Sequence, residues 1–340
     1  MKMLNQNTYS YAGMFATALR WVAGWTYFSA FWRRLIIDNK LIRDEAGYIG
    51  EKFNHFLPNA LGIKPIIEYL ILNPDMLWWA MVIFTLVEAI VGLFLILGLF
   101  TRLASIGMFL LAMSILLGSG WIGTTCLDEW QIGVLGVASG FSLFIMGGGR
   151  FSMDEFLIRK NKSFTHKKWF AKLASGELNC KENRVSKIVL TGSVLIFGLT
   201  LYTNQVFHGS VFGTLHNKSV RPHLEISEAE IIDNQLIFKI YRTEGADVYG
   251  SFLIGIKLSD KYGETVFELN HEQFSKLEPN QIENDYVAKI KPDKYSLIIP
   301  LGAKAKMLLP LNELKIENDE TYLLELIDIS GLSWQTEIKN

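Results

Sequence analysis

Long apolar runs, interrupted by short polar segments, fill the first 207 residues of the chain. A helix needs roughly 20 apolar residues to cross a bilayer. The segments 103–118 and 188–202 contain no charged residue at all, as expected of helices surrounded by lipid. We therefore expect an integral membrane α-helical bundle of four helices, followed by a fifth linking helix. The predicted spans cover residues 12–35, 76–100, 102–120, 128–148 and 187–207.

The pattern changes after about residue 208, where short apolar runs of β-type residues replace the long ones. Examples are QLIFKIYR, SFLIGIKLS and TYLLELIDI, which are separated by Gly, Pro, Asn and Asp. The remaining residues, 208–340, are numerous enough to form a hydrophobic core of their own. They predict an antiparallel β-sandwich domain.

Composition supports the membrane assignment. Of 340 residues, 50% are hydrophobic and 20% are charged, and the mean hydropathy of +0.22 is high for a soluble protein. The net charge of -1 provides no basic field that would attract nucleic acid. Two cysteines exclude a disulfide scaffold and a cysteine-based zinc site. The lipid bilayer is thus the first expected partner.

Charge distribution predicts the orientation of the spans. Between Arg150 and Lys187 the sequence contains ten Lys or Arg and four Asp or Glu, which indicates a cytoplasmic segment, the basic loop 151–186. The N-terminus and the turn at Arg102 then lie inside. Residues 38–75, the turn SGWIGTTCLDEW and the domain 208–340 lie outside. The β-sandwich is therefore expected to be extracytoplasmic.

Two charged residues fall within predicted spans, Arg20 and Glu88. Intramembrane charges are costly and are functional candidates by default. At about 1.5 Å rise per residue, the two lie at similar depths on antiparallel spans, which predicts a buried pair. Either the pair is purely structural, or Glu88 also exchanges protons with a bound quinone.

Five residues of the first span share one helical face, because they recur at spacings of four and three. This face either lines a polar and aromatic channel or is the packing side of the helix, where a glycine permits close approach. The residues are Arg20, Gly24, Tyr27, Phe31 and Arg34.

Arg33 and Arg34 stand at the outer end of the first span, where the positive-inside tendency would not place them. They either bind an anion, or extend to lipid head groups and pair with nearby acids. Those acids are Asp38, Asp44 and Glu45.

The turn GSGWIGTTCLDEWQIG concentrates polar and aromatic residues at the predicted outer face, including Trp121, Asp128, Glu129 and Trp130. Interfacial anchoring by the tryptophans and helix capping by the acids explain part of this pattern. The turn also holds Cys126, whereas Cys180 lies in the basic loop on the opposite side. Cys126 is therefore predicted to be an unpaired thiol, either reactive toward a sulfur substrate or buried and inert.

Two further patterns narrow the chemistry. In GGGRFSMDEFL, Ser152 and Glu155 have the spacing of a capping box, which predicts a structural role. The six histidines lack metal-ligand spacing, and none lies within a predicted span, so neither a metal site nor bis-histidine haem is expected. An electron carrier would then be organic, and a quinone dissolved in the bilayer is the natural one.

The chain resembles thiosulfate:quinone oxidoreductase (TQO), in the form where a DoxD membrane subunit is fused to a DoxA subunit. The DoxD resemblance rests on RWVAGWTYFSAFWRR, VEAIVGLFLILGLFTR, GWIGTTCLDEWQIG and GGGRFSMDEF. The DoxA resemblance rests on YGSFLIGIKLSDKYG, QIENDYVAKIK and IIPLGAKAKMLLP. Together these resemblances imply a protein of the bacterial cytoplasmic membrane. It would have a DoxD-like transmembrane domain over 1–150 and a DoxA-like domain over 208–340. Many DoxX-like membrane proteins share the VEAIVGLFLILGLFTR pattern alone.

The resemblance implies oxidation of two thiosulfates to tetrathionate and reduction of one quinone, ubiquinone or menaquinone, without flavin, metal or haem. Position and chemistry then assign the roles. Catalytic candidates are Cys126, Asp128 and Glu129; thiosulfate-binding candidates are Arg33, Arg34, Lys64 and Trp121; quinone-site candidates are Glu88, Arg20, Tyr27 and Trp130. The DoxA-like domain is expected to act as a lid or anion funnel. The alternative is a DoxX-like subunit that only binds or passes small sulfur anions, or scaffolds a partner enzyme. Glycine-lined spans would also allow a homodimer.

Overall fold

The computed structural model describes residues 6–43, 45, 47–123, 128–176, 180–246, 251–311 and 320–339. The chain divides into two compact units. The first unit comprises Met1–Ile49, Trp78–Gly120 and Leu127–His216, and the second comprises Gly50–Leu77, Trp121–Cys126 and Asn217–Asn340.

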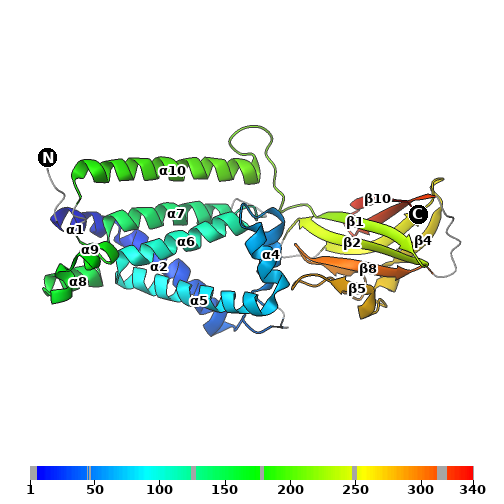
Figure 1. The fold of residues 1–340 in the computed structure, drawn as a ribbon, viewed down its shortest axis with the longest axis horizontal. Helices are drawn as coiled ribbons and strands as arrows, with labels where there is room; N and C mark the ends of the chain where they lie inside the picture. The colour runs from blue at the N-terminus through cyan, green and yellow to red at the C-terminus, as the bar shows by residue number, and fades with distance from the viewer. Residues whose placement is uncertain are drawn as a thin grey trace. The chain divides into compact units, whose positions relative to one another are not determined.

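The first unit is a helical bundle (Figure 1). Among the residues that the structure describes, four helices are long and apolar enough to cross a membrane, which confirms the predicted membrane class. They are α5 (Pro74–Leu97), α6 (Thr101–Ser119), α7 (Asp128–Met146) and α10 (Glu182–His208). Within the bundle α6 packs along α7, and α10 also contacts α7. Leu190, Leu195 and Phe197 of α10 remain exposed, as lipid-facing side chains would.

The first predicted span is not one regular helix. It consists of α1 (Gln6–Phe15) and α2 (Thr17–Phe31), which are separated at Ala16, and a π-helix, η1 (Trp32–Ile37). Short π-helical segments occur frequently at functional sites. Here the π-helix carries both arginines of the predicted anion site.

A glycine pair sets the distance between α2 and α5. A Cβ atom on Gly24 would lie 2.9 Å from the carbonyl oxygen of Gly92, and one on Gly92 would lie 2.5 Å from the nitrogen of Phe28. The two backbones therefore touch, as is common where small residues meet in membrane helices. Arg20, Gly24 and Tyr27 are all buried, so the predicted shared face is the packing side of α2.

Short helices follow α7, in the segment that the sequence predicts to be a basic cytoplasmic loop. The Ser152 hydroxyl accepts a hydrogen bond from the Glu155 amide at 3.1 Å, so the predicted cap at the start of α8 is confirmed. These helices are α8 (Met153–Arg159), η3 (Ser163–His166) and α9 (Lys168–Leu173).

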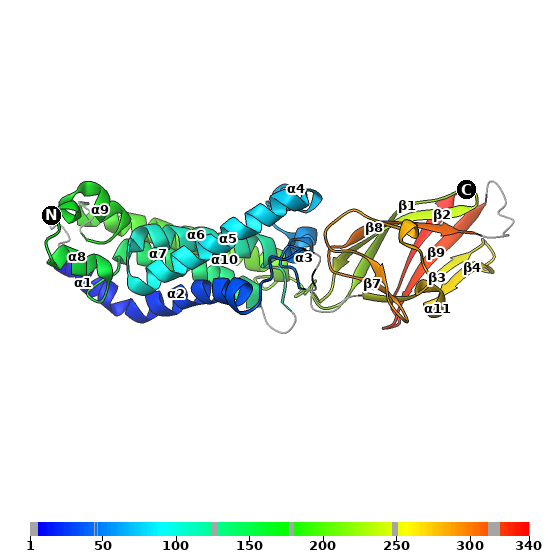
Figure 2. The ribbon, with the colours of Figure 1, turned by 90° about the horizontal axis from the view of Figure 1, so that it is seen from below.

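The second unit contains two antiparallel β-sheets that enclose a hydrophobic core, which confirms the predicted antiparallel β domain (Figure 2). The four-stranded sheet has the order β1-β2-β8-β5, and the other has the order β10-β9-β3-β7-β6 with β4 paired to β3. Burial alternates along β9 and β8, so every second side chain points into the core. The strands are β1 (His223–Ile232), β2 (Gln235–Glu244), β3 (Ser251–Ser259), β4 (Thr265–Asn270), β5 (Ile282–Asn284), β6 (Lys291–Pro292), β7 (Leu297–Ile299), β8 (Lys304–Pro310), β9 (Thr321–Asp328) and β10 (Ser333–Lys339). Between β4 and β5 lie α11 (His271–Phe274) and η4 (Pro279–Gln281).

The segment between the first two predicted spans folds with this β domain. It contains α3 (Glu51–Phe56), η2 (Leu57–Asn59) and α4 (Lys64–Leu72). The fully buried Asn54 amide donates to the Gly302 carbonyl at 3.2 Å and accepts from the Ala288 amide at 3.1 Å. A sequence segment of the membrane half is thus part of the second unit.

Candidate functional site

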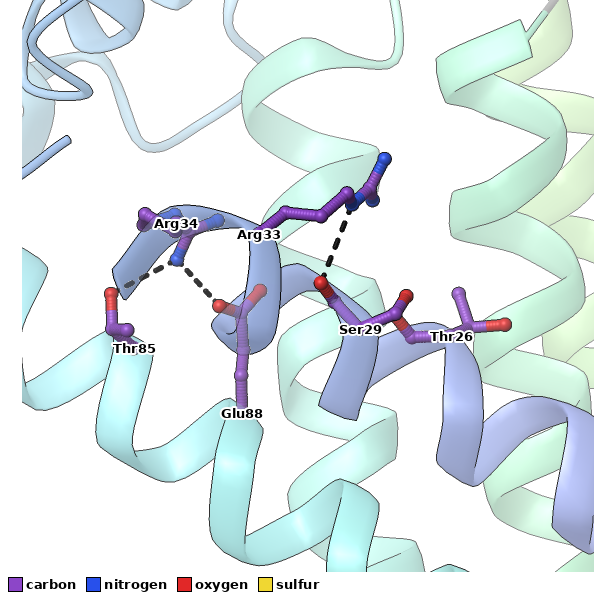
Figure 3. A network of polar contacts seen from close by, with 6 residues as sticks. All are labelled: Thr26, Ser29, Arg33, Arg34, Thr85 and Glu88. Atoms are coloured by element: carbon purple, nitrogen blue, oxygen red, sulfur yellow. Dashed lines mark hydrogen bonds and ion pairs between the residues drawn. The ribbon is translucent and has the colours of Figure 1, made fainter. Parts of the chain in front are cut away.

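The candidate site of the first unit is centred on Glu88, a carboxylate in α5 that is only 4% exposed. Its Oε2 atom accepts a hydrogen bond from Arg34 Nη1 at 2.5 Å, and the same guanidinium nitrogen donates to the Thr85 hydroxyl at 3.1 Å (Figure 3). The Arg34 guanidinium also lies 5.9 Å from the centre of the Phe84 ring. The π-helix and α5 are therefore joined by a buried, charge-assisted contact.

The predicted pairing of Glu88 with Arg20 is wrong. The crossing of Gly24 and Gly92 fixes the register of the antiparallel helices. Arg20, one turn before Gly24, reaches the end of α5, whereas Glu88, one turn before Gly92, lies on the other side of the crossing. Between Glu88 and Ile96 the helix rises about 12 Å, at about 1.5 Å per residue. A depth estimate from the sequence cannot resolve that difference.

Arg20 instead holds the C-terminal end of α5. Its guanidinium donates to the carbonyls of Leu95 at 2.6 Å, Ile96 at 3.0 Å and Phe151 at 2.8 Å. The last carbonyls of a helix have no partner within the helix, and they carry partial negative charge. This position of Arg20 indicates a structural role.

A second buried arginine binds carbonyl groups at the C-terminal end of α7. Arg102 is fully buried and donates to the carbonyls of Phe144 at 3.0 Å and Gly176 at 2.9 Å, and also to that of Ala171. Beside it, the Asp154 carboxylate accepts from the Thr101 amide at 2.9 Å at the start of α6. Buried charges at this end of the bundle thus complement helix termini.

Arg33 differs from Arg34 in being exposed. Its Nε atom donates to the Ser29 carbonyl at 3.3 Å, and in Figure 3 its guanidinium extends away from the Arg34–Glu88 contact. Among the described acids, Asp38 approaches Lys40 at 3.8 Å, whereas Asp44 lies outside the described residues. Of the two predicted anion-binding arginines, Arg33 is therefore the accessible one.

Tyr27 reaches into the interior of the bundle. Its side chain is 5% exposed, and its hydroxyl lies 3.0 Å from where a Cβ atom on Gly136 of α7 would stand. The hydroxyl is also within electrostatic range of Glu88. The structure thus brings together Tyr27, Glu88 and Arg34 from the predicted set, and adds Thr85, one turn before Glu88, which the sequence analysis missed.

The remaining predicted residues have other neighbours. The Trp130 indole donates to the Thr203 hydroxyl of α10 at 3.0 Å, and the fully buried Trp121 donates to the Phe56 carbonyl in the second unit at 3.2 Å. Glu129 is half-buried in the first turn of α7. Cys126 lies outside the described residues, and of Asp128 only the backbone is described, at the start of α7.

Lys64 belongs to the second unit, where it lines a cavity between α4 and the β domain. In the part of the chain that the structure describes, no group of three or more His, Cys, Asp or Glu is arranged to hold a metal ion. The contacts of Arg34, Thr85 and Glu88 show that the site in the first unit can supply charge, hydrogen bonds and a titratable carboxyl group.

Two family models match the chain. Residues 15–181 match the TQO small subunit DoxD, and residues 207–337 match the TQO small subunit DoxA. The first match begins at the last residue of α1 and extends to the residue before α10, and it includes Arg33, Arg34 and Glu88. The second covers all of the described strands up to the last residues of β10. The chain therefore belongs to the TQO small-subunit families DoxD and DoxA, fused in one polypeptide.

Proposed function

We propose that this chain oxidises two thiosulfates to tetrathionate and passes the two electrons to a membrane quinone. Membership of both TQO small-subunit families supports a TQO-related role. The observation that carries the specific proposal is the buried Glu88 carboxylate, paired with Arg34 beside the exposed cation of Arg33. An intramembrane acid next to a surface cation suits a reaction that joins an anionic donor to a lipid-soluble acceptor.

The reaction needs protons as well as electrons. Two thiosulfate dianions lose two electrons when their sulfane sulfurs join, and the quinone takes up those electrons together with two protons. Glu88 and Tyr27 are titratable groups within the bundle, and they would pass protons toward the quinone. Glu129 and Asp128, at the start of α7, are the candidates for supplying those protons from the surface.

The thiosulfate dianion requires positive charge in its binding site. Arg33 would supply charge-assisted hydrogen bonds, since its guanidinium is exposed. Arg34 would act indirectly: its ion pair with Glu88 fixes the position of that carboxylate, and its charge adds to the positive charge of Arg33. By the charge distribution of the loops, this end of the bundle would face the outside of a bacterial cytoplasmic membrane.

Cys126 is our candidate for the covalent step. Its thiolate would form a sulfur–sulfur bond with the sulfane sulfur of one thiosulfate, while two electrons and two protons reduce the quinone to quinol. The sulfane sulfur of a second thiosulfate would then attack that of the adduct, releasing tetrathionate and the Cys126 thiolate. This assignment rests on the chemistry of the thiol alone.

One observation favours a simpler role, in which the chain is a subunit that binds sulfur anions or scaffolds a partner enzyme and does not itself catalyse a reaction. The buried guanidinium of Arg20 is already engaged by carbonyls, and the half-buried guanidinium of Arg34 is engaged by Glu88. In this alternative Arg33 still binds the anion, but no electrons are transferred.

The deciding experiment measures quinone reduction by the detergent-purified chain with thiosulfate as sole donor, together with tetrathionate formation. Cys126→Ser is compared with Cys180→Ser, the matched control at the only other cysteine. Quinol and tetrathionate formed in equal amounts, lost in Cys126→Ser and retained in Cys180→Ser, support the enzyme and the nucleophile. Full activity of Cys126→Ser contradicts the covalent step. An inactive wild-type chain that still binds thiosulfate supports the binding subunit.

A further inference from the structure

Charge is strongly segregated in residues 151–176, the α8–α9 segment, which follows α7 and contains α8, η3 and α9. Its two acids, Asp154 and Glu155, are 0% and 5% exposed. By contrast, all six of its Lys and Arg residues are exposed: Arg159, Lys160, Lys162, Lys167, Lys168 and Lys172. Among the described residues, only Arg159 of these six has an ion-pair partner, Glu155 at 3.2 Å. The surface of the segment therefore carries five uncompensated ammonium groups.

Large apolar side chains are exposed on the same segment. Phe156 of α8 is 52% exposed and Trp169 of α9 is 42% exposed, and Phe151 and Met153 are exposed as well. The Lys160 ammonium lies 5.7 Å from the centre of the Phe156 ring, so a cation and an aromatic ring share one part of the surface. Exposure of such side chains to water is unfavourable. Cations beside apolar rings are typical of helices that lie in the interface of a bilayer.

Buried contacts hold the α8–α9 segment against the ends of the membrane-spanning helices. The Asp154 carboxylate accepts hydrogen bonds from the amides of Phe100 at 2.8 Å and Thr101 at 2.9 Å, at the start of α6. The Phe170 ring of α9 is 1% exposed and lies 6.4 Å from the Phe100 ring between centroids. Figures 1 and 2 show α8 and α9 together at the end of the bundle where α5 ends and α6 begins. The cations and the exposed rings are therefore held where these helices leave the membrane.

We propose that the α8–α9 segment binds anionic phospholipids of the leaflet at this end of the bundle. Its lysines would pair with the lipid phosphate groups, while its exposed apolar side chains enter the boundary between head groups and acyl chains. Long lysine side chains can place their ammonium groups among the head groups and keep their methylene groups beside apolar neighbours. The cations are spread over both short helices and the turn between them, so an extended anionic surface suits them better than one small anion.

Thermal unfolding of the full chain in uncharged detergent tests this proposal. Phosphatidylglycerol or phosphatidylcholine with the same acyl chains is added to the micelles at increasing concentration. A lipid that binds only the folded chain raises the unfolding temperature, and the concentration dependence gives its affinity. Phosphatidylglycerol should stabilise the wild-type chain much more than phosphatidylcholine, and added salt should reduce the difference.

A variant of the segment tests whether its lysines hold the lipid. Lys160→Gln/Lys162→Gln/Lys167→Gln/Lys168→Gln should bind phosphatidylglycerol roughly tenfold more weakly or worse, because four charges next to the anionic surface are lost. All four side chains are exposed, so the variant should fold, and unfolding without added lipid verifies this.

The matched control removes the same number of charges from exposed lysines of the β domain. It carries Lys276→Gln, Lys289→Gln, Lys291→Gln and Lys294→Gln. This control should retain the wild-type affinity for phosphatidylglycerol. Equal weakening in both variants would reflect net charge alone and would overturn the assignment to the α8–α9 segment.

Three further outcomes would overturn the proposal. The first is equal stabilisation of the wild-type chain by the two lipids, and the second is unchanged affinity for phosphatidylglycerol in the segment variant. The third is stabilisation by inorganic phosphate as large as that by phosphatidylglycerol, which would indicate a site for a free anion. Because none of these measurements involves turnover, they do not depend on the proposed reaction.

Discussion

Glu88 accepts a hydrogen bond from Arg34 across 2.5 Å, and this contact links a π-helix at the end of α2 to the middle of α5. The Glu88 side chain is 5% exposed and that of Arg34 is 15% exposed, so water screens the pair weakly. Removing one partner from a buried pair is more costly than replacing both with apolar residues. The pair is therefore open to a double-mutant test.

Arg34→Met should lower the free energy of unfolding by about 3 kcal/mol, because it leaves the Glu88 carboxylate without its cation. Glu88→Gln should cost less, since the Arg34 side chain reaches the surface. The double variant Arg34→Met/Glu88→Leu should be more stable than Arg34→Met alone. Unfolding in detergent measures all three, and additive losses in the double variant would contradict a direct buried interaction.

Arg33→Gln should behave differently from substitutions at Arg34. The Arg33 side chain is exposed, so unfolding should change by less than about 0.5 kcal/mol. If Arg33 binds thiosulfate, KM for thiosulfate should rise roughly tenfold in the variant, because one charge-assisted hydrogen bond to the anion is lost. Arg150→Gln, at an exposed arginine of the segment after α7, is the matched control. An unchanged KM in Arg33→Gln would remove this residue from the anion site.

Because α2 and α5 are in contact at Gly92, a substitution there should lower the stability of the chain much more than the same substitution at Gly198. Gly92→Ala places a methyl group 2.5 Å from the Phe28 nitrogen, and only a shift of backbone can relieve that contact. Overpacking of this kind costs about 1–3 kcal/mol. At Gly198 of α10 an added methyl group meets nothing within 4 Å, so Gly198→Ala should be neutral or stabilising. Thermal unfolding of the two variants compares them, and equal effects would argue against the crossing.

Hydropathy and charge predict the later spans and the β domain, because both depend on local composition. They do not predict that Arg20 meets the carbonyls of Leu95 and Ile96, since side-chain partners depend on helix register. The same limit applies to Asn54. Its two hydrogen bonds to the β domain join segments more than two hundred residues apart, and no local pattern encodes such a contact. The π-helix was not predicted either, because the sequence pattern around Arg33 is that of a continuing α-helix.

Alkaline pH should weaken the contact between α4 and the β domain. Burial, and secondarily the charge of Glu68, raise the pKa of Tyr286 above its ordinary value of 10.0. A group whose pKa is raised on folding contributes stability that is fully present below its unfolded pKa and is lost as the pH rises through the folded one. The Tyr286 hydrogen bond to Glu68 should therefore stabilise the chain up to about pH 10 and progressively less above it.

Tyr286→Phe removes this hydrogen bond and should lower the free energy of unfolding at pH 8 by about 1 kcal/mol. The difference between wild type and variant should shrink as the pH rises above 10, because the unfolded wild-type chain then gains the ionised phenol. Tyr262→Phe, at a tyrosine that is 80% exposed, serves as the control and should show a much smaller difference. Unfolding measured from pH 8 to pH 11 gives both curves. A wild-type advantage that grows with pH would show that Tyr286 ionises more readily in the folded chain, contrary to its burial beside Glu68.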